Sequence, residues 1–457
     1  LKRVLIICGV NGNKYNWYDE VHLHSEYHAH ILGARKTRTG RWNTGSLNTV
    51  MEDLDNLPNC MFLICNIEKL RSGRRPTRRG QRKSISEFPV VEKIQKLIDA
   101  GEIGMVVVDE IHKCKSPTSQ QSQALLWLTA PRMIGASGTV VIGGPVDLYV
   151  PLKWLQLEFR KYYDFQQRFC VKDYFGSVVG YQNVAELMDV LHSYQLRRLK
   201  KDILDLPEKI HTIEYVELTP PEVKVYGAVE FGIWSALDGE VINPAGLKKD
   251  LFEIDAMQQP ITVALRLRQA VAATCLVSDD IDKSSKLDRM EEMIEDMVQS
   301  GEKCIVFSMY SQVVELIRAR LSAKKYKPAV ITGEVSQPMR VAEMKRFQTD
   351  DNCKCIVGTV GAMGTGYTLT AATNVIFVDE PWTMADKMQC EDRAHRVGTK
   401  SNVNVITIMA RDTVDERIHQ IVENKGDVAD MVVDGVVNPR SRSALIRMLL
   451  GPRSISR

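Results

Sequence analysis

Two carboxylates, Asp109 and Glu110, directly follow an apolar run at Met105–Val108. A nucleotide hydrolase needs one carboxylate to hold Mg²⁺ and a second to orient and deprotonate the attacking water. In that chemistry Asp109 would hold the metal ion and Glu110 would act as the general base. An Asp-Glu pair after a strand can also simply cap the helix that follows it. The pair by itself therefore allows both hydrolysis and helix capping.

A pair of arginines far along the chain is the second candidate group. On a helix, Gln389, Arg393 and Arg396 would fall at positions i, i+4 and i+7, on a single face. Glu391 and Asp392 could pair with these arginines and leave a solvated charged helix. Two arginines on one stripe of a second sheet domain instead suit a charge clamp on a γ-phosphate. We therefore predict that Arg393 and Arg396 are catalytic.

Small residues follow two other apolar strands. Gly364 and Gly366 lie in the turn after Cys355–Val357, where glycine lets the backbone approach a ligand closely. Ser137 and Thr139 follow another strand, and their hydroxyls could link a nucleotide site to a neighbouring element. Each of these turns is weak evidence alone, and together with the carboxylates and arginines they become more specific.

The chain opens with an apolar strand and a loop that contains Gly9, Gly12 and Lys14. A loop that wraps a triphosphate needs the spacing Gly-x4-Gly-Lys-Ser/Thr. Here Tyr15 follows Lys14, the glycine spacing differs, and the pattern occurs nowhere else in the sequence. We therefore do not expect this loop to bind ATP.

Parallel β-sheets are expected to position these groups. Short β-branched runs alternate with helical periodicity, which is typical of parallel sheets covered by helices on both faces. The predicted strands are Val4–Cys8, Met61–Cys65, Met105–Val108 and Arg132–Ala136 in one sheet, and Cys304–Phe307, Pro328–Ile331, Cys355–Val357, Asn374–Val378 and Val403–Met409 in another. Ligand groups gather beyond the carboxyl ends of such strands. The predicted fold class is α/β with two parallel-sheet lobes.

The segment between the two sheets is mainly helical, with one extended piece at Ile210–Leu218. We predict a first lobe at 1–158, helical insertions and an interlobe linker at 159–285, a second lobe at 286–435 and a basic C-terminal tail at 436–457. Within the tail, the apolar stretch Ala444–Leu450 is expected to dock on the second lobe rather than on DNA.

The composition narrows the class of protein. The 457 residues carry a net charge of +3 and a hydrophobic fraction of 44%, which suits two or three packed domains. The ten cysteines are scattered without Cys-x-x-Cys spacing, which favours reduced core residues and no structural zinc. No apolar run reaches the ~18 residues that cross a membrane. We expect a monomer without membrane contact, in the cytoplasm of a bacterial or phage-infected cell, or in the nucleus of a eukaryote.

Positive charge is concentrated in segment 69–83, here called the arginine loop. It carries eight basic and no acidic residues, among them Arg74, Arg75, Arg78 and Arg79. Such a run can be a solvated loop, or it can neutralise DNA phosphates without reading bases. We expect sequence-independent contact with duplex DNA.

The order of these groups resembles that of the Swi/Snf-like ATPases of helicase superfamily 2. The matching segments are 109–119 for the DEAH box, 136–155 for the third motif, 196–209 for the stretch leading into the second lobe, 268–269 for an Arg-Gln pair, 364–382 for motif V and 389–398 for motif VI. The opening segment 6–21 resembles motif Ia, whose loop lies along DNA in this family. The resemblance spans almost the whole chain.

This resemblance implies two RecA-like lobes, ATP and Mg²⁺ as cofactors and double-stranded DNA as the partner. It implies that Asp109 binds the metal ion and that Glu110, Arg393 and Arg396 act in hydrolysis. It also implies nucleotide contacts at His112, Gly364, Gly366 and Gln389, and DNA contacts at Lys14, Ser137, Thr139 and Thr359.

The sequence departs from the family pattern at a few places. The Gly-Lys-Thr loop that precedes motif Ia in the family is absent, and the first residue is Leu1, so we expect that the true N-terminus precedes this sequence. Val140 replaces the usual Pro of the third motif, and Thr399 replaces a Gln that often ends motif VI. The compact length is typical of a phage or bacterial motor.

The predicted function is ATP-driven translocation on double-stranded DNA that remodels DNA or DNA–protein complexes. Within the same enzyme class, the alternatives are a strand-separating helicase and the motor of a restriction enzyme. From a different class, the chain could be a DNA-binding protein with an inactive nucleotide site. An upstream Gly-Lys-Thr/Ser segment would separate the last alternative from the others.

Overall fold

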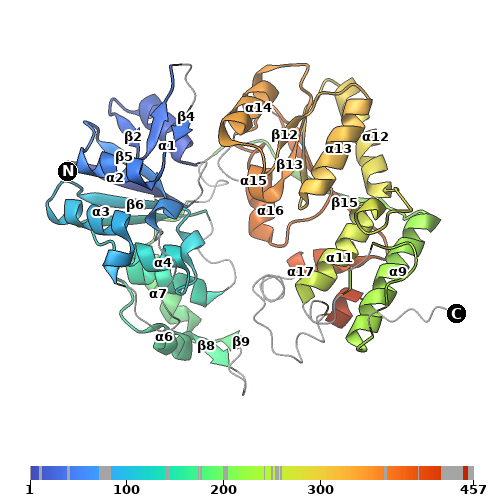
Figure 1. The fold of residues 1–457 in the computed structure, drawn as a ribbon, viewed down its shortest axis with the longest axis horizontal. Helices are drawn as coiled ribbons and strands as arrows, with labels where there is room; N and C mark the ends of the chain where they lie inside the picture. Colours follow the sequence, from blue (N-terminus) through green and yellow to red (C-terminus); the bar gives the residue numbers. More distant parts are fainter. Residues whose placement is uncertain are drawn as a thin grey trace. The chain divides into compact units, whose positions relative to one another are not determined.

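The computed structural model describes residues 2–9, 13–38, 42–71, 84–138, 144–172, 174, 178–198, 204–240, 242–248, 251–252, 257, 260–364, 368–399, 401–423 and 446–450. The chain divides into two compact units, unit 1 at Leu1–Arg197 and unit 2 at Arg198–Arg457 (Figure 1). The boundary falls inside the stretch that was expected to lead into the second lobe. The predicted middle segment 159–285 is shared between the two units.

Unit 1 contains a parallel sheet with the strand order β2-β5-β1-β6-β7. Its strands are β1 (Val4–Cys8), β2 (Ala29–Ile31), β5 (Phe62–Asn66), β6 (Met105–Asp109) and β7 (Arg132–Ala136). Two antiparallel hairpins accompany the sheet, β3 (Ala34–Lys36) with β4 (Trp42–Thr44) and β8 (Cys170–Lys172) with β9 (Val178–Tyr181).

Helices cover both faces of this sheet because alternate residues of its strands are apolar on opposite sides. Val4 and Ile6 pack in a cluster with side chains of α1 (Asn13–His24), whereas Leu5 and Ile7 pack with α3 (Pro89–Asp99). The remaining helices of unit 1 are α2 (Leu47–Asp55), α4 (Gln120–Leu125), α5 (Tyr149–Trp154), α6 (Tyr162–Phe169) and α7 (Val184–Tyr194), with 3-10 turns η1 (Ile67–Leu70), η2 (Ile85–Glu87), η3 (Ile111–Cys114) and η4 (Pro145–Leu148).

Unit 2 contains a second parallel sheet with the order β10-β15-β14-β11-β13-β12. Its strands are β10 (Lys209–Val216), β11 (Cys304–Ser308), β12 (Ala329–Ile331), β13 (Cys355–Thr359), β14 (Asn374–Phe377) and β15 (Val403–Ala410). The extended piece that the sequence placed in the helical middle is β10, an edge strand of this sheet. The prediction of two parallel α/β sheets is confirmed.

The helices of unit 2 also cover both faces of its sheet. They are α9 (Pro220–Leu237), α11 (Pro260–Ala272), α12 (Ser285–Gln299), α13 (Ser311–Ala323), α14 (Gln337–Thr349), α15 (Val360–Met363), α16 (Met384–Glu391) and α17 (Val414–Glu423), with the turn η5 (Thr274–Leu276). Cys304 and Val306 face a core with α11, α12, α13 and α17, whereas Ile305 and Phe307 face α14, α15 and α16.

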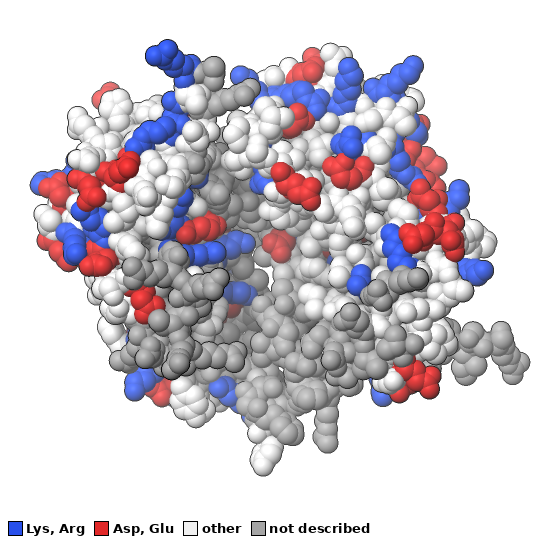
Figure 2. Space-filling model, viewed as in Figure 1, with Lys and Arg blue, Asp and Glu red and all other residues white. Residues whose placement is uncertain are grey.

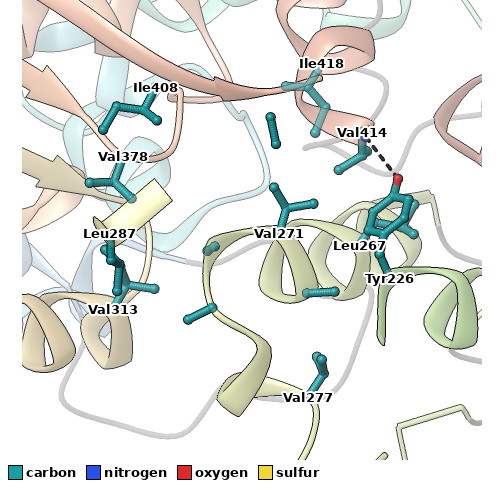
Figure 3. Close-up of a cluster of buried hydrophobic side chains, with 14 of the residues drawn as sticks. Tyr226, Leu267, Val271, Val277, Leu287, Val313, Val378, Ile408, Val414 and Ile418 are labelled. Atoms are coloured by element: carbon teal, nitrogen blue, oxygen red, sulfur yellow. Dashed lines mark hydrogen bonds between the residues drawn. The ribbon is translucent and has the colours of Figure 1, made fainter. Parts of the chain in front are cut away.

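The larger core of unit 2 joins segments far apart in sequence. Figure 3 shows Leu267 and Val271 of α11 among the side chains of this core. The hydroxyl of Tyr226 in α9 accepts a hydrogen bond of 3.0 Å from the backbone N–H of Val414 at the start of α17 (Figure 3). Burial raises the pKa of this Tyr226 hydroxyl. α9, α11 and α17 therefore form one packed group.

The apolar C-terminal stretch docks on unit 2, as expected. Ile446, Leu449 and Leu450 are buried in the same core, and Arg417 Nη1 donates to the Leu449 carbonyl at 2.7 Å. All ten cysteines are free thiols. None of the helices in the described ranges combines the length and apolar character needed to span a bilayer.

Candidate functional site

Asp109 ends β6, beside Cys8 at the end of β1 and Ala136 at the end of β7. Its Oδ2 accepts hydrogen bonds from Asn13 Nδ2 at 3.0 Å and from Trp17 Nε1 at 3.1 Å. Both donors lie on α1, so this helix fixes the carboxylate. The sequence did not reveal these contacts. In the sequence, Asn13 and Trp17 lie in segment 6–21, which resembles a motif whose loop lies along DNA.

Glu110 follows in a left-handed conformation, with φ 53° and ψ 48°. This region is uncommon for residues other than glycine and costs roughly 1–3 kcal/mol, so the surrounding fold must hold it in place. Gly9 provides part of that environment. Its N–H donates to the Asp109 carbonyl at 2.9 Å, and a Cβ at Gly9 would lie 2.8 Å from the carbonyl oxygens of Asp109 and Glu110. Glycine is therefore required where β1 meets the carboxylate pair.

His112 connects the carboxylate pair to β7. Its Nδ1 lies 2.7 Å from Ser137 Oγ and 3.2 Å from Glu110 Oε2. Burial, followed by the charges of Lys113 and Lys115, lowers the pKa of His112 to about 4 despite the nearby carboxylate. His112 is therefore neutral near pH 7, and its Nδ1 lies between Glu110 and Ser137, the residue after β7. A link from a nucleotide site through Ser137 stays a prediction.

In unit 2, Thr359 ends β13 and is the N-cap of α15. Gly364 follows α15, and a Cβ at this position would lie 2.5 Å from the Val360 carbonyl oxygen and 3.0 Å from Cys390 Sγ of α16. Because a side chain would not fit there, Gly364 lets the turn after β13 pack against the helix that carries Gln389. Close packing against α16 therefore requires glycine at position 364, whether or not a ligand binds there.

The expectation of one helix face for Gln389, Arg393 and Arg396 is wrong. α16 ends at Glu391, and residues 392–399 form turns. The turns are closed by Thr399, whose Oγ1 accepts from the Arg396 N–H at 3.0 Å and lies 2.7 Å from the Ala394 carbonyl oxygen. We call residues 392–399 the arginine turn.

The side chains of the arginine turn are held by nearby oxygens. Arg393 Nε donates to the Gln389 carbonyl at 3.0 Å, and Arg396 Nη1 donates to Thr368 Oγ1 at 3.2 Å. The Arg393 carbonyl accepts from the Leu369 N–H at 2.8 Å, which joins the turn to the segment after Gly364. Arg393 is half-buried and Arg396 is exposed.

The acidic residues of this segment have partners on β10. Lys209 Nζ lies 2.9 Å from Glu391 Oε2 and 3.1 Å from Asp392 Oδ1, and His211 Nε2 lies 3.1 Å from Glu391 Oε1. These carboxylates raise the pKa of Lys209 although its burial opposes the effect. Glu391 and Asp392 are therefore engaged by the edge strand rather than only by the neighbouring arginines.

Lys14, predicted to contact DNA, is buried, with 3% of its surface exposed. Burial, followed by the charge of Lys69, lowers the pKa of Lys14. Its Nζ lies 5.0 Å from the centre of the Tyr15 ring. A phosphate contact there stays a prediction. Thr139, Gly366, Arg74, Arg75, Arg78 and Arg79 lie outside the described residues.

Residues 2–275, more than half of the chain, match the family model of the SNF2-related domain. The chain belongs to the SNF2-related family. In addition, residues 285–398 of this SNF2-related chain match the helicase conserved C-terminal domain. Asp109 and Glu110 lie in the first matched region, and the arginine turn falls almost entirely within the second.

Relatives of this SNF2-related chain include the Mus musculus protein named DNA annealing helicase and endonuclease ZRANB3. It is 27% identical over 360 residues, which cover 75% of this chain and 31% of the relative. An uncharacterized ATP-dependent helicase of Mycoplasma pneumoniae is 26% identical over 387 residues, which cover 83% of this chain and 35% of the relative. The chain thus spans about a third of the length of these relatives.

Among solved structures, the Sulfolobus solfataricus SWI2/SNF2 ATPase core in complex with dsDNA is similar over 98% of this chain and 86% of that chain. The sequence identity is 22% and the TM-score is 0.42.

Proposed function

We propose that this chain is the motor of an enzyme that hydrolyses ATP and translocates on double-stranded DNA. The observation that carries the proposal is the carboxylate pair at the end of β6, with Asp109 oriented by two donors and Glu110 beside His112, whose Nδ1 also lies near Ser137. Membership in the SNF2-related family supports it, as do the names of relatives described as helicases.

Asp109 is the residue that would hold Mg²⁺. Mg²⁺ usually takes one or two protein carboxylates and completes its shell with waters and phosphate oxygens. One carboxylate with Oδ2 already fixed by Asn13 and Trp17 fits that requirement. No cluster of three or more metal-ligating side chains occurs in the described part of the chain, so other ligands would come from the nucleotide and water. The chemistry supplied by Mg²⁺ would be neutralisation of phosphate charge.

Glu110 is proposed to accept a proton from the attacking water. Its neighbour His112 is neutral near pH 7, because burial lowers the pKa of His112 to about 4. The imidazole therefore lies beside the carboxylate, with Nδ1 3.2 Å from Oε2, without adding a positive charge that would weaken the base. Ser137, whose Oγ lies 2.7 Å from the same His112 Nδ1, would connect the end of β7 to this carboxylate.

Arg393 and Arg396 are proposed to stabilise negative charge that develops on the γ-phosphate. They need no common helix face for this role, because the arginine turn projects them from the end of α16. Gln389 and Gly364 would contribute to the nucleotide side of unit 2. Thr359, Ser137, Lys14 and the arginine loop are proposed for contact with DNA.

The contacts with DNA phosphates, which would be independent of base sequence, are proposed to lie away from α12 and α13. On the face drawn in Figure 2, acidic and basic side chains are intermixed over α12 and α13. Ion pairs such as Arg320–Asp288 and Lys324–Glu291 account for part of this pattern. A surface of both signs is a poor site for a polyanion. The proposed phosphate contacts therefore lie elsewhere, first of all in the arginine loop.

The test uses protein that carries the predicted upstream Gly-Lys-Thr segment. We expect duplex DNA to stimulate ATP hydrolysis, and we expect ATP to drive displacement of a third strand from a triplex. A forked duplex should stay paired under the same conditions. Unwinding of the fork would instead indicate a strand-separating helicase, and absence of hydrolysis would indicate a DNA-binding protein with an inactive nucleotide site.

A further inference from the structure

A group of buried charges lies in unit 2, at the end of β14. Arg268 of α11 has 1% of its surface exposed, and Asp379 and Glu380, which follow β14, have 1% and 6% exposed. Arg268 Nη2 donates to the Glu380 backbone carbonyl at 2.5 Å, and its guanidinium carbon lies 4.6 Å from the centre of the Trp382 ring. Arg268 thus holds the segment that connects β14 to α16.

The Glu380 side chain joins two helices. Its Oε1 accepts from Lys387 Nζ of α16 at 2.5 Å, and its Oε2 lies 2.8 Å from His419 Nδ1 of α17. Lys387 and Glu380 have only 8% and 6% of their side chains exposed. Burial alone would raise the pKa of Glu380, but the hydrogen bonds from His419 and Lys387 outweigh burial and lower it. Glu380 is therefore a charged clamp between α16 and α17.

Stability alone does not explain such a group. Replacing a buried ion pair by packed apolar residues often leaves stability unchanged or improves it. Moreover, the described residues offer no hydrogen-bond partner to Arg268 Nε and Nη1 or to Asp379 Oδ1, although these atoms are buried. Unsatisfied buried groups carry a cost. Buried polar groups that lower stability can still favour one geometry over the alternative arrangements that apolar side chains would allow.

The geometry that Glu380 specifies is that of the arginine turn. Lys387 lies on α16 two residues before Gln389, whose carbonyl accepts from Arg393 Nε at 3.0 Å. α16 ends at Glu391, so a shift of this helix would move Arg393 and Arg396 with it. A misplacement of about 1 Å can cost on the order of a hundredfold in rate.

We propose that Glu380 is a positioning residue, which holds α16 through Lys387 at the place from which Arg393 and Arg396 act. Arg268 and His419 hold Glu380 from α11 and α17. The catalytic part of this inference rests on the function proposed above. The effect of Glu380 on the position of α16 follows from contacts within unit 2 and does not depend on that function.

The first test is a kinetic mutant cycle of Glu380→Gln and the paired variant Arg393→Ala/Arg396→Ala. Glu380→Gln keeps the shape of the side chain and removes its charge. We expect kcat to fall between about tenfold and a hundredfold, with the KM for ATP and the Kd for duplex DNA unchanged. In the background that carries both Arg393→Ala and Arg396→Ala, Glu380→Gln should lower kcat by much less, because the residue acts through the arginine turn. Additive losses would overturn the proposal.

The second test measures amide hydrogen exchange of α16, which requires no hydrolysis. In Glu380→Gln the amides of Met384–Glu391 should exchange about tenfold faster, whereas those of α12 should not change. Unchanged exchange in α16 would overturn the proposal. Arg268→Lys, which keeps the charge but lacks the planar donor fork, should give the same pattern if Glu380→Gln does not fold.

A matched control is Glu315→Gln on α13, where Glu315 pairs with Arg318 at an exposed site. It should change neither kcat nor the exchange of α16. If the parent protein does not hydrolyse ATP, the proposed function fails, and hydrogen exchange still decides whether Glu380 positions α16.

Discussion

Asp109 shows at the scale of single residues how a site is fixed before any ligand binds. Its carboxylate receives hydrogen bonds from Asn13 and Trp17, which are 96 and 92 residues away in sequence. A short apolar strand followed by Asp-Glu predicted the position of the pair. It could not predict donors from α1, because that contact depends on how α1 packs on the sheet. The sequence therefore located the carboxylates and missed what orients them.

Replacing Trp17 by Phe should weaken metal binding at Asp109. The change keeps an aromatic ring and removes the N–H that donates to Oδ2. Loss of a partner that orients a metal ligand typically costs about tenfold to a hundredfold in metal affinity. We expect a rise of about tenfold in the Mg²⁺ concentration that gives half-maximal hydrolysis. Trp127→Phe, at a Trp that is 41% exposed, is the control and should leave the Mg²⁺ dependence unchanged.

His112 and His419 should contribute to stability with opposite dependence on pH. Burial, then Lys113 and Lys115, lowers the pKa of His112 to about 4 from the usual value of 6.5. As pH falls below 6.5, the unfolded chain binds this proton first, so His112 destabilises the fold by about 1.4 kcal/mol per pH unit until about pH 4. The hydrogen bond with Glu380 raises the pKa of His419, so its contribution is complete below 6.5 and is lost as pH rises through the folded value.

The check is thermal unfolding of His112→Gln and His419→Gln from pH 5 to pH 9, each compared with the parent. The difference between His112→Gln and the parent should shift in favour of the variant as pH falls from 7 to 5. For His419→Gln, the deficit of the variant should shrink as pH rises. The same trend for both variants would show that the protonation states inferred here are wrong.

At the scale of secondary-structure elements, strands with a short apolar run could be located from the sequence, whereas a largely exposed strand could not be assigned to a sheet. β1 and β7 have the predicted bounds: β1 is a continuous apolar run between Arg3 and Gly9, and β7 lies between Pro131 and Ser137. β10 was recognised as extended but not as part of a sheet. Most of its residues are exposed or half-buried, and its partner β15 lies almost 200 residues further along. Whether such a segment becomes an edge strand depends on pairing with a strand far away in the sequence, and a local sequence pattern does not reveal that pairing.

The arginine turn shows a different limit of sequence patterns. Helical spacing of Gln389, Arg393 and Arg396 fitted a continuous helix, but the helix ends at Glu391. Hydrogen bonds of Thr399 close the turn, and Gly398 has a φ of 103°, which favours glycine. Spacing identified which residues share a segment but not where the helix stops.

Arg396→Ala should lower kcat without abolishing binding to duplex DNA. The guanidinium donates to Thr368 Oγ1 at 3.2 Å and is exposed, so its removal should not disturb the core. Arginines that stabilise a transferring phosphoryl group contribute on the order of 10³–10⁵ in rate. Steady-state hydrolysis and DNA affinity are measured on the same preparation. Collapse of DNA affinity with the rate per bound complex preserved would place this arginine on DNA instead.

At the scale of the whole molecule, we expect a motor that binds DNA through its phosphates. The arginine loop carries eight of the 60 Lys and Arg residues of the chain and no acidic residue. A single segment seldom places all of its charges on phosphates, so about two or three phosphate contacts are expected, each adding roughly −0.9 to the slope of log K against log salt.

Replacing Arg74, Arg75, Arg78 and Arg79 with serine should flatten that slope by about two units. The loss of affinity should be similar on two duplexes of unrelated sequence. Salt titrations of the parent and variant on both duplexes provide the measurement. An unaltered slope would mean that the loop is solvated, and a loss confined to one duplex would mean that it reads bases.

The central claim is that Glu110 is the general base of ATP hydrolysis at the end of β6. The most direct measurement compares ATP turnover and ATP affinity of Glu110→Gln with the parent, in protein that carries the predicted upstream Gly-Lys-Thr segment and in the presence of duplex DNA. We predict that ATP affinity is retained and that kcat falls by at least about a hundredfold, the range expected for a removed base. An unchanged kcat would contradict it.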